Sequence, residues 1–326
     1  MRPSLFVLAV ILALPFEGRA AYPERPITLI VPFAAGGPTD VVARIVGEHM
    51  SRTLGQQLVV ENVVGAGGTI ASTKAAQATP DGYTLIMGHM GTHGAAPAVY
   101  PDLKYDPAKS FAPIGMAAGT PILIVAKKSF PAKDLKEFVA YLKKNSETLN
   151  EAHAGVGSVS FTTCAFFNSL VGAKPTRVVY RGTGPALNDL VSGQVDYMCD
   201  QIVNLVPQIQ AGTIKAYGVA LPQRSPALPD VPTTKEGGLP EFQVSAWNAI
   251  FAPKGTPPEV VKKLSDALAK ALADENTRKR LVDLGADLSD KAAQTPEGLA
   301  KLVDSEVARW KKVLASVSRD AAPPAK

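Results

Sequence analysis

Strand-like and helix-like segments alternate along this chain, and the alternation limits its fold more than any other feature. Residues 27–33 form a short, nearly continuous apolar run, which is typical of a strand buried on both faces. Residues 38–54 then carry apolar side chains at helical spacing, and Gly55 follows as a stop signal. The pattern continues as a strand, a helix and a strand over residues 57–62, 69–78 and 83–88. We therefore predict a βαβαβ unit with a parallel sheet.

A second α/β series is predicted between residues 121 and 220. Its expected strands cover residues 121–128, 149–155, 176–180, 195–200 and 214–220, and its expected helices cover residues 135–144, 160–172, 184–193 and 202–212. A proline-rich loop (221–240) and one more strand (243–253) follow, and the rest of the chain is expected to be helical.

The helices after residue 253 have no strands of their own, so we assign them to the first unit. The chain then crosses between the units twice, near residues 119–122 and 244–250, and two such crossings make a hinge. We predict lobe 1 from residues 21–120 and 245–326, and lobe 2 from residues 121–244.

Residues 1–20 have the layout of a secretory signal peptide. Arg2 precedes an apolar run from Leu5 to Phe16, and small residues lead to an expected cleavage site after Ala20. The apolar run is too short for a bilayer, which needs roughly 20 residues. We therefore expect a soluble, exported protein.

The charge pattern argues against nucleic acid as a partner. The formal net charge is +5, but the lysines are scattered and are not interleaved with aromatic residues. A mild positive balance can help to attract anionic ligands.

Four loops that follow expected strands place small residues and hydroxyl groups where a helix begins. They are residues 33–40, 65–69, 155–160 and 181–184. Unpaired backbone amides and the helix dipole favour an anion at such positions. These loops lie at the carboxyl ends of strands, where open α/β sheets bind ligands. Two such loops that face each other across a cleft would suit a ligand with a negative group at each end.

Signals for other chemistries are missing or incomplete. The loop at residues 31–40 lacks the G-x-G-x-x-G spacing, the glycines at 65–68 meet it only loosely, and there is neither a phosphate-binding lysine loop nor a G-x-S-x-G elbow. His89 and His93 have i,i+4 spacing, but we expect a glycine-broken loop there, and no glutamate follows His89. We expect no catalytic centre, cofactor or metal, and we expect His93 either to contact a ligand or to hydrogen-bond within its loop.

Five residues each have two interpretations. Arg181 either clamps a carboxylate or is a surface arginine near the cleft. Asp200 either repels the wrong ligand or, as we favour, hydrogen-bonds a loop. Trp247 either covers the ligand or packs in the core. Cys164 and Cys199 either form a disulfide, as an oxidising compartment permits, or remain two buried thiols; they have no C-x-x-C spacing.

Several stretches resemble, in order, the receptors of tripartite tricarboxylate transporters, the Bug family. They are YPERPITLIVPFAAGGPTDVVAR, ENVVGAGGTIAS, PDGYTLIMG, GVGSVS, VVYRGTGPALNDLVSGQVDYM and FAPKGTPPEVV. The resemblance implies an α/β, two-lobed periplasmic binding protein type II fold with a ligand cleft between the lobes. It also implies a receptor, not an enzyme, that delivers a small carboxylate to membrane permease subunits. We expect a dicarboxylate and a monomeric receptor.

The resemblance further implies roles for the matching loops. Residues 33–39 hold one carboxylate through backbone amides and waters, residues 65–69 close over it, and residues 158–162 and 181–183 hold the distal end. Together with Thr92, His93 and Asp200, to which the resemblance assigns no role, the expected ligand-binding residues are Phe33, Ala35, Gly37, Thr39, Gly67, Thr69, Ser158, Ser160, Phe161, Thr162, Arg181, Gly182 and Thr183. Relatives commonly have a polar side chain at Phe161, so this ring is expected to make the second subsite more apolar.

Two alternatives remain open from the sequence. A sensory periplasmic protein would present the same ligand to a signalling partner, and an enzyme would act on a similar anion in the same cleft. The sequence does not identify the carboxylate.

Overall fold

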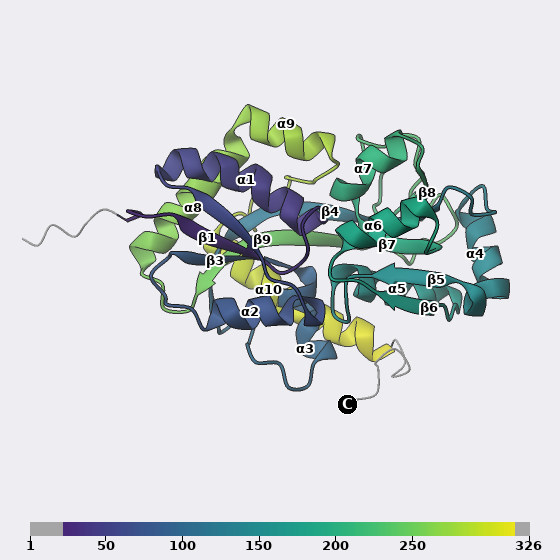
Figure 1. The fold of residues 1–326 in the computed structure, drawn as a ribbon, viewed down its shortest axis with the longest axis horizontal. Coiled ribbons are helices and arrows are strands. Elements are labelled where there is room, and N and C mark those ends of the chain that lie inside the picture. Colours follow the sequence, from purple (N-terminus) through teal and green to yellow (C-terminus); the bar gives the residue numbers. More distant parts are fainter. Residues whose placement is uncertain (1–21, 317–326) are drawn as a thin grey trace, which may run out of the picture.

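One mixed β-sheet runs through the molecule, and helices cover both of its faces (Figure 1). The computed structural model describes residues 22–316, so the predicted signal peptide lies outside the described residues. The sheet has nine strands in the order β2-β1-β3-β9-β4-β7-β5-β6, and β8 pairs with β4. This is the α/β architecture that alternating strand and helix signals predict.

The N-terminal part of the sheet is the predicted βαβαβ unit. Strands β1 (Ile27–Val31), β2 (Leu58–Asn62) and β3 (Thr84–His89) pair in parallel, with β1 in the middle. They are connected by helix α1 (Pro38–Leu54) and, after a short 3-10 turn at Ala66–Gly68, by helix α2 (Thr69–Ala76). Helix α1 ends as predicted at Gly55, whose left-handed φ of 72° turns its N–H back to the carbonyl of Ser51.

Strand β4 (Phe111–Lys127) begins ten residues before the strand predicted there. The first part of this strand is difficult to predict from the sequence because it contains Pro113 and Gly115, and neither residue is typical of a strand interior. The register with strand β9 (Ser245–Pro253) shifts between these two residues, and this irregularity accommodates them.

Strand β4 is shared by two groups of strands. Up to Pro121, β4 pairs antiparallel with β9, and β9 in turn pairs antiparallel with β3. From Ile122 onward, β4 pairs antiparallel with β7 and β8. We call residues 22–121 and 245–316 the first half of the molecule and residues 122–244 the second half. The two halves lie side by side in Figure 1.

The second half contains the strands and helices expected from its sequence, but its sheet is mixed. Strands β7 and β8 run antiparallel to β4, whereas β5 runs parallel to both β6 and β7. Its elements are α4 (Leu135–Asn145), a 3-10 turn (Ser146–Thr148), β5 (Asn150–His153), α5 (Val159–Val171), β6 (Thr176–Val179), α6 (Thr183–Ser192), β7 (Tyr197–Gln201), α7 (Ile202–Gln210) and β8 (Ile214–Val219).

The glycine-broken loop expected around His93 is wrong. Residues Met90–Ala95 form a π-helix, and helix α3 (Ala96–Val99) follows directly. His89 makes this possible, because its ring nitrogen Nδ1 accepts hydrogen bonds from the backbone N–H groups of Gly91 and Thr92, at 2.7 and 3.2 Å. A histidine that caps a helix has no simple signature in a sequence.

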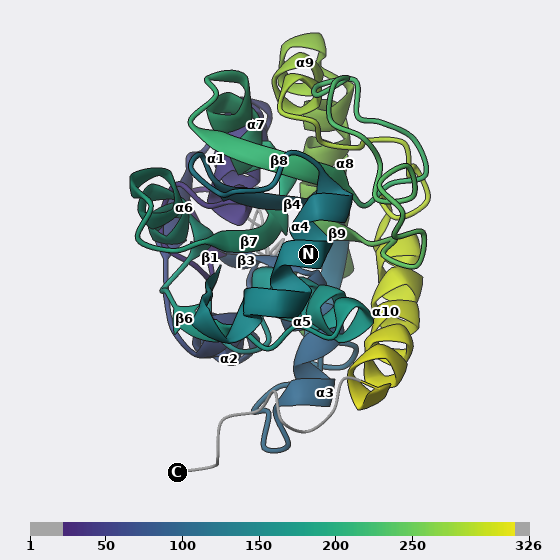
Figure 2. The same cartoon turned by 90° about the vertical axis from the view of Figure 1, so that its right-hand side faces the viewer.

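The C-terminal helices α8 (Pro258–Ala273), α9 (Glu275–Asp283) and α10 (Pro296–Ser316) pack mainly on the first half. Helix α8 packs against α1 and β4, and α10 packs against β4 and the π-helix. Helix α10 also passes beside α5 of the second half, as Figure 2 shows.

A disulfide joins Cys164 on α5 to Cys199 on β7, with the two Cα atoms 5.2 Å apart. Both cysteines are completely buried. The bond fixes helix α5 against the strand whose end carries Asp200 and Gln201.

Candidate functional site

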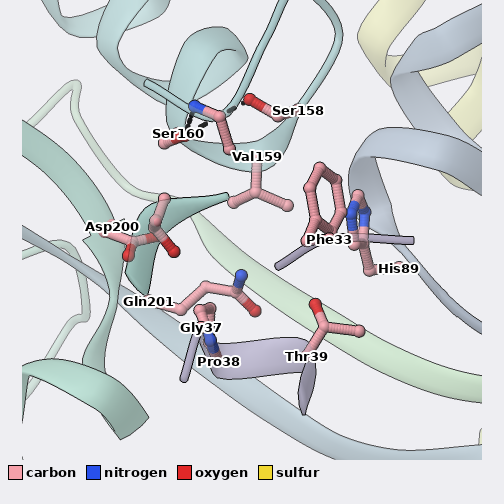
Figure 3. Close-up of a pocket in the computed structure, with 12 residues that line it drawn as sticks. Phe33, Gly37, Pro38, Thr39, His89, Ser158, Val159, Ser160, Asp200 and Gln201 are labelled. Atoms are coloured by element: carbon pink, nitrogen blue, oxygen red, sulfur yellow. Dashed lines mark hydrogen bonds between the residues drawn. The ribbon is translucent and has the colours of Figure 1, made fainter. Parts of the chain in front are cut away.

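A pocket lies between the two halves, at the point where helices α1, α5 and α6 begin (Figure 3). Its volume is about 260 Å³, counting the part open to solvent, which is small for a ligand site. The lining residues are Phe33, Gly37, Pro38, Thr39, His89, Ala154, Ser158, Val159, Ser160, Thr183, Asp200 and Gln201.

The start of α1 presents backbone amides to this pocket. Gly37 is the N-cap residue, and no side chain caps this end of the helix. The preceding loop is held by Asp40, which accepts hydrogen bonds from the Gly36 N–H at 3.1 Å and from Arg44 Nε at 2.9 Å. Although burial opposes it, hydrogen bonding to Arg44 and Asn62 keeps the pKa of Asp40 below its usual value. Asp40 is therefore a positioning residue for the loop.

The starts of α5 and α6 supply hydroxyl groups. Ser158 caps α5 by accepting a hydrogen bond from the Phe161 N–H, and its hydroxyl lies 3.2 Å from that of Ser160. Helix α6 begins at Thr183 after Gly182, and no side chain caps it. Three helix N-termini thus point their positive dipole ends at one small space.

No lysine or arginine lines the pocket. An anion bound here would be stabilised by helix dipoles, backbone amides and neutral side chains, in partly buried surroundings where water screens them less than in bulk solvent. This arrangement favours small carboxylates over phosphates of nucleotides, which would need more space.

His89 is a neutral hydrogen-bond donor in the pocket wall. Burial lowers the pKa of His89 to about 3, so the ring is uncharged at neutral pH. Because Nδ1 already accepts two backbone hydrogen bonds, the single ring hydrogen is on Nε2. The ring stacks on Phe33, with 4.9 Å between the ring centroids.

Gln201 connects the pocket to the strands that join the halves. Its Oε1 accepts hydrogen bonds from the Thr120 hydroxyl at 2.6 Å and from Asn248 Nδ2 at 2.9 Å. Thr120 is on β4 and Asn248 is on β9, and all three side chains are buried.

The loops of the two halves touch above and below the pocket. The Ala34 N–H donates to the Arg181 carbonyl at 3.1 Å, and a Cβ on Gly184 would lie 2.6 Å from the Ala35 carbonyl oxygen. On the other side, a Cβ on Gly67 would lie 1.9 Å from the Val156 carbonyl oxygen. Glycine is needed at such positions because the backbones approach so closely.

Some of the predicted residues line the pocket and others do not. Those that line it are Phe33, Gly37, Thr39, Ser158, Ser160, Thr183 and Asp200. Those that the structure places elsewhere are Ala35, Gly67, Thr69, Thr92, His93, Phe161, Thr162, Arg181 and Gly182.

The residues outside the lining have visible structural contacts. His93 is buried against Phe251, with 4.2 Å between ring centroids, and the Phe161 ring packs against His153. Arg181 is exposed and meets the first half through its carbonyl group. Trp247 is buried in the core, and its Nε1 donates to Glu306 at 3.3 Å.

His89, Ala154 and Gln201 line the pocket but belong to none of the loops expected to bind the ligand. His89 and Gln201 each directly follow a predicted strand, at the strand end where open α/β sheets bind ligands. Their position at a strand end is the sequence signal that could have identified both residues as pocket residues. Within residues 22–316, no group of acidic, histidine or cysteine side chains could hold a metal ion, and none of the helices has the length and apolar character to cross a membrane.

The fold matches that of solved periplasmic binding proteins, and the family match assigns the chain to their class of solute receptors. The chain belongs to the tripartite tricarboxylate transporter family of receptors, whose family model matches residues 42–318. The resemblance drawn from the sequence motifs is thereby confirmed.

Three solved structures support the same assignment. MatC from Rhodopseudomonas palustris, solved with malate bound, is 52% identical, with a TM-score of 0.87 over 90% of this chain and 100% of that chain. The periplasmic binding protein BugD is 43% identical, with a TM-score of 0.88 over 91% and 98% of the two chains. Another R. palustris protein, solved with adipate, is 33% identical, with a TM-score of 0.86 over 91% and 98%.

Proposed function

We propose that this protein is a periplasmic receptor that binds a small dicarboxylate between its lobes and delivers it to the permease of a tripartite tricarboxylate transporter. The observation that carries the proposal is the convergence of three helix N-termini on a small pocket that no lysine or arginine lines. Malate and adipate in two similar structures support a ligand with two carboxylates.

The proposed lobes are those expected from the sequence, residues 21–120 with 245–326 and residues 121–244. They close about β4 and β9, and the closed form is the one that the permease recognises. Small-angle X-ray scattering should therefore show a smaller radius of gyration when ligand is added. An unchanged radius at saturating ligand would contradict closure.

A ligand screen tests the proposed substrate class. Thermal unfolding should be measured with C4 to C8 dicarboxylates, terephthalate, citrate, amino acids, nucleotides and sugars. At least one dicarboxylate should raise the melting temperature, because a ligand that binds only the native state stabilises it by about 2.7 kcal/mol at 100 times its Kd. Stabilisation by nucleotides or sugars alone would overturn the proposal.

Two variants test the location of the site. Thr39→Val and Ser158→Ala should each weaken binding of the ligand that the screen identifies, as measured by titration calorimetry. Matched controls are Thr73→Val on α2 and Ser169→Ala on α5, whose hydroxyl groups bond to their own helices. Equal affinity in both site variants and both controls would remove these loops from the site.

The delivery step is tested in cells that lack the gene for this chain. Uptake of labelled ligand should be lost and should return with the intact gene. If uptake persists while ligand-induced gene expression disappears, the protein is a sensor rather than a transport receptor. Size-exclusion chromatography with light scattering should show a monomer.

A further inference from the structure

Asp200 has one oxygen without a hydrogen-bond partner among the described residues. The side chain is fully buried and lines the pocket, and its Oδ2 accepts a hydrogen bond from Asn204 Nδ2 at 3.0 Å. Its Oδ1 accepts no hydrogen bond of good geometry within residues 22–316, although the Gln201 N–H and the Thr183 hydroxyl lie near enough to the carboxyl group to oppose the rise in its pKa. A buried oxygen without a hydrogen bond is unfavourable. A ligand that donates a hydrogen bond to Oδ1 should therefore bind more tightly than a ligand that lacks such a donor.

Asp200 also has no positive partner in this pocket. No lysine or arginine lines the space, and no ion pair of the described residues includes Asp200. Burial raises the pKa of the Asp200 carboxyl to about 6, so it is mostly ionised at neutral pH and acts as an acceptor. A carboxylate is an unexpected neighbour for an anionic ligand, unless the ligand also carries a donor.

Figure 3 places Asp200 on the side of the pocket opposite Phe33 and His89. The helix N-termini lie between these two walls. A ligand whose carboxylates face the helix starts would therefore turn part of its carbon chain toward Asp200.

We propose that Asp200 selects dicarboxylates that carry a hydrogen-bond donor, a hydroxyl or an ammonium group, on the carbon beside a carboxylate. This assignment rests on the proposed function and names the substrate class within it. The helix starts hold the carboxylates, and Asp200 Oδ1 accepts the extra donor. An unsubstituted diacid leaves Oδ1 unpaired and places a methylene group against it.

Titration calorimetry at pH 7.5 with succinate, L-malate and L-aspartate tests the assignment. These three acids share a four-carbon chain and differ at one carbon, which carries no donor, a hydroxyl or an ammonium group. The unaltered protein should bind malate, aspartate or both at least about tenfold more tightly than succinate, as expected for one hydrogen bond to a charged group. Whichever of malate and aspartate binds more tightly shows whether the preferred donor is a hydroxyl or an ammonium group.

The Asp200→Asn variant tests the residue itself. The preference over succinate should fall below about threefold, and succinate affinity should stay the same or rise, because a negative charge has been removed. Asp196→Asn is the matched control. Asp196 is another largely buried acid, beside the start of β7, but it pairs with Lys127 at 2.7 Å and does not line the pocket. This control should keep the preference.

Three results would overturn the assignment: equal binding of the three acids by the unaltered protein, binding of longer unsubstituted diacids only, or a preference that survives Asp200→Asn. The ligand series on the unaltered protein does not depend on whether a variant folds. If no dicarboxylate of any kind binds, the proposed function fails and this assignment fails with it.

Discussion

The Tyr100 hydroxyl donates a hydrogen bond of 2.6 Å to the carbonyl oxygen of Val156. The two residues belong to opposite halves of the molecule and lie 56 positions apart in the chain. Gly67 lies against the same carbonyl group. This contact fastens the halves together beside the pocket.

The Tyr100→Phe variant should loosen the closed form. It removes one hydrogen bond, worth about 0.5–1.5 kcal/mol, and leaves the ring in place. Ligand affinity should fall by roughly two- to tenfold, with most of the change in the dissociation rate. Stopped-flow measurement of ligand release checks this expectation.

Tyr22→Phe is the control for that experiment. The Tyr22 hydroxyl donates to the Gly82 carbonyl at 2.8 Å, but both residues belong to the first half. Ligand release from this variant should match that of the unaltered protein. If both variants release ligand at the same rate, the Tyr100 contact does not hold the closed form.

Two substitutions of His89 should separate its two roles. His89→Asn keeps an acceptor near the position of Nδ1, which can still accept from the Gly91 and Thr92 amides, but it lacks the Nε2 donor. The affinity for ligand should therefore fall about tenfold, while the melting temperature should change little. His89→Gln keeps a donor near Nε2 and lacks the cap, so it should lower stability by about 1 kcal/mol.

The charge state of His89 gives a pH test. Since burial lowers its pKa to about 3, the ring stays neutral from pH 5 to 8. The difference in binding free energy between the unaltered protein and His89→Asn should be constant over that range. A difference that changes with a midpoint near pH 6.5 would mean that the ring binds as a cation.

Glu151 should make stability fall as pH rises. This buried carboxyl accepts a hydrogen bond from Asn168, and burial raises its pKa to about 7, against the effect of Arg177. The unfolded chain releases this proton near pH 4.5 and the folded chain only near pH 7, so the folded state is penalised increasingly between those values.

Glu151→Gln removes that penalty. The variant's free energy of unfolding, relative to the unaltered protein, should rise by up to about 3 kcal/mol between pH 5 and pH 8. Urea unfolding at several pH values measures it. A constant difference across the range would show that Glu151 ionises alike in both states.

The Cys164–Cys199 disulfide should contribute substantially to stability. It closes a loop with a sequence separation of 35, for which the chain-entropy model gives about 4 kcal/mol. The double variant Cys164→Ala with Cys199→Ala should melt at a clearly lower temperature. Thiol titration of the protein purified and denatured without reductant should find no free thiol, and two free thiols would show that the bond does not form.

The sequence predicts the fold well where local signals agree with one another. Helix α1 has an apolar face and ends at Gly55, and β1 is a buried apolar run, so both were expected with nearly the observed bounds. The start of β4 was missed because Pro113 and Gly115 are tolerated only through irregular pairing with β9, which is distant in sequence.

The site was less predictable than the fold. Loop composition pointed to Thr39, Ser158 and Thr183, because hydroxyls at helix starts have a direct physical meaning. Of the two histidines the sequence favours His93 as a ligand contact, but His89 lines the pocket and His93 packs on Phe251. Side-chain direction around a π-helix depends on tertiary packing that spacing alone does not encode.

The disulfide between α5 and β7 ties the hydroxyl groups at one wall of the pocket to the strand end that carries Asp200 and Gln201. These two elements therefore act as one rigid unit, and that unit is completed only by oxidation. A chain still in a reducing compartment would lack this brace. Ligand affinity would then depend on the redox state of this one bond, even though neither cysteine lines the pocket.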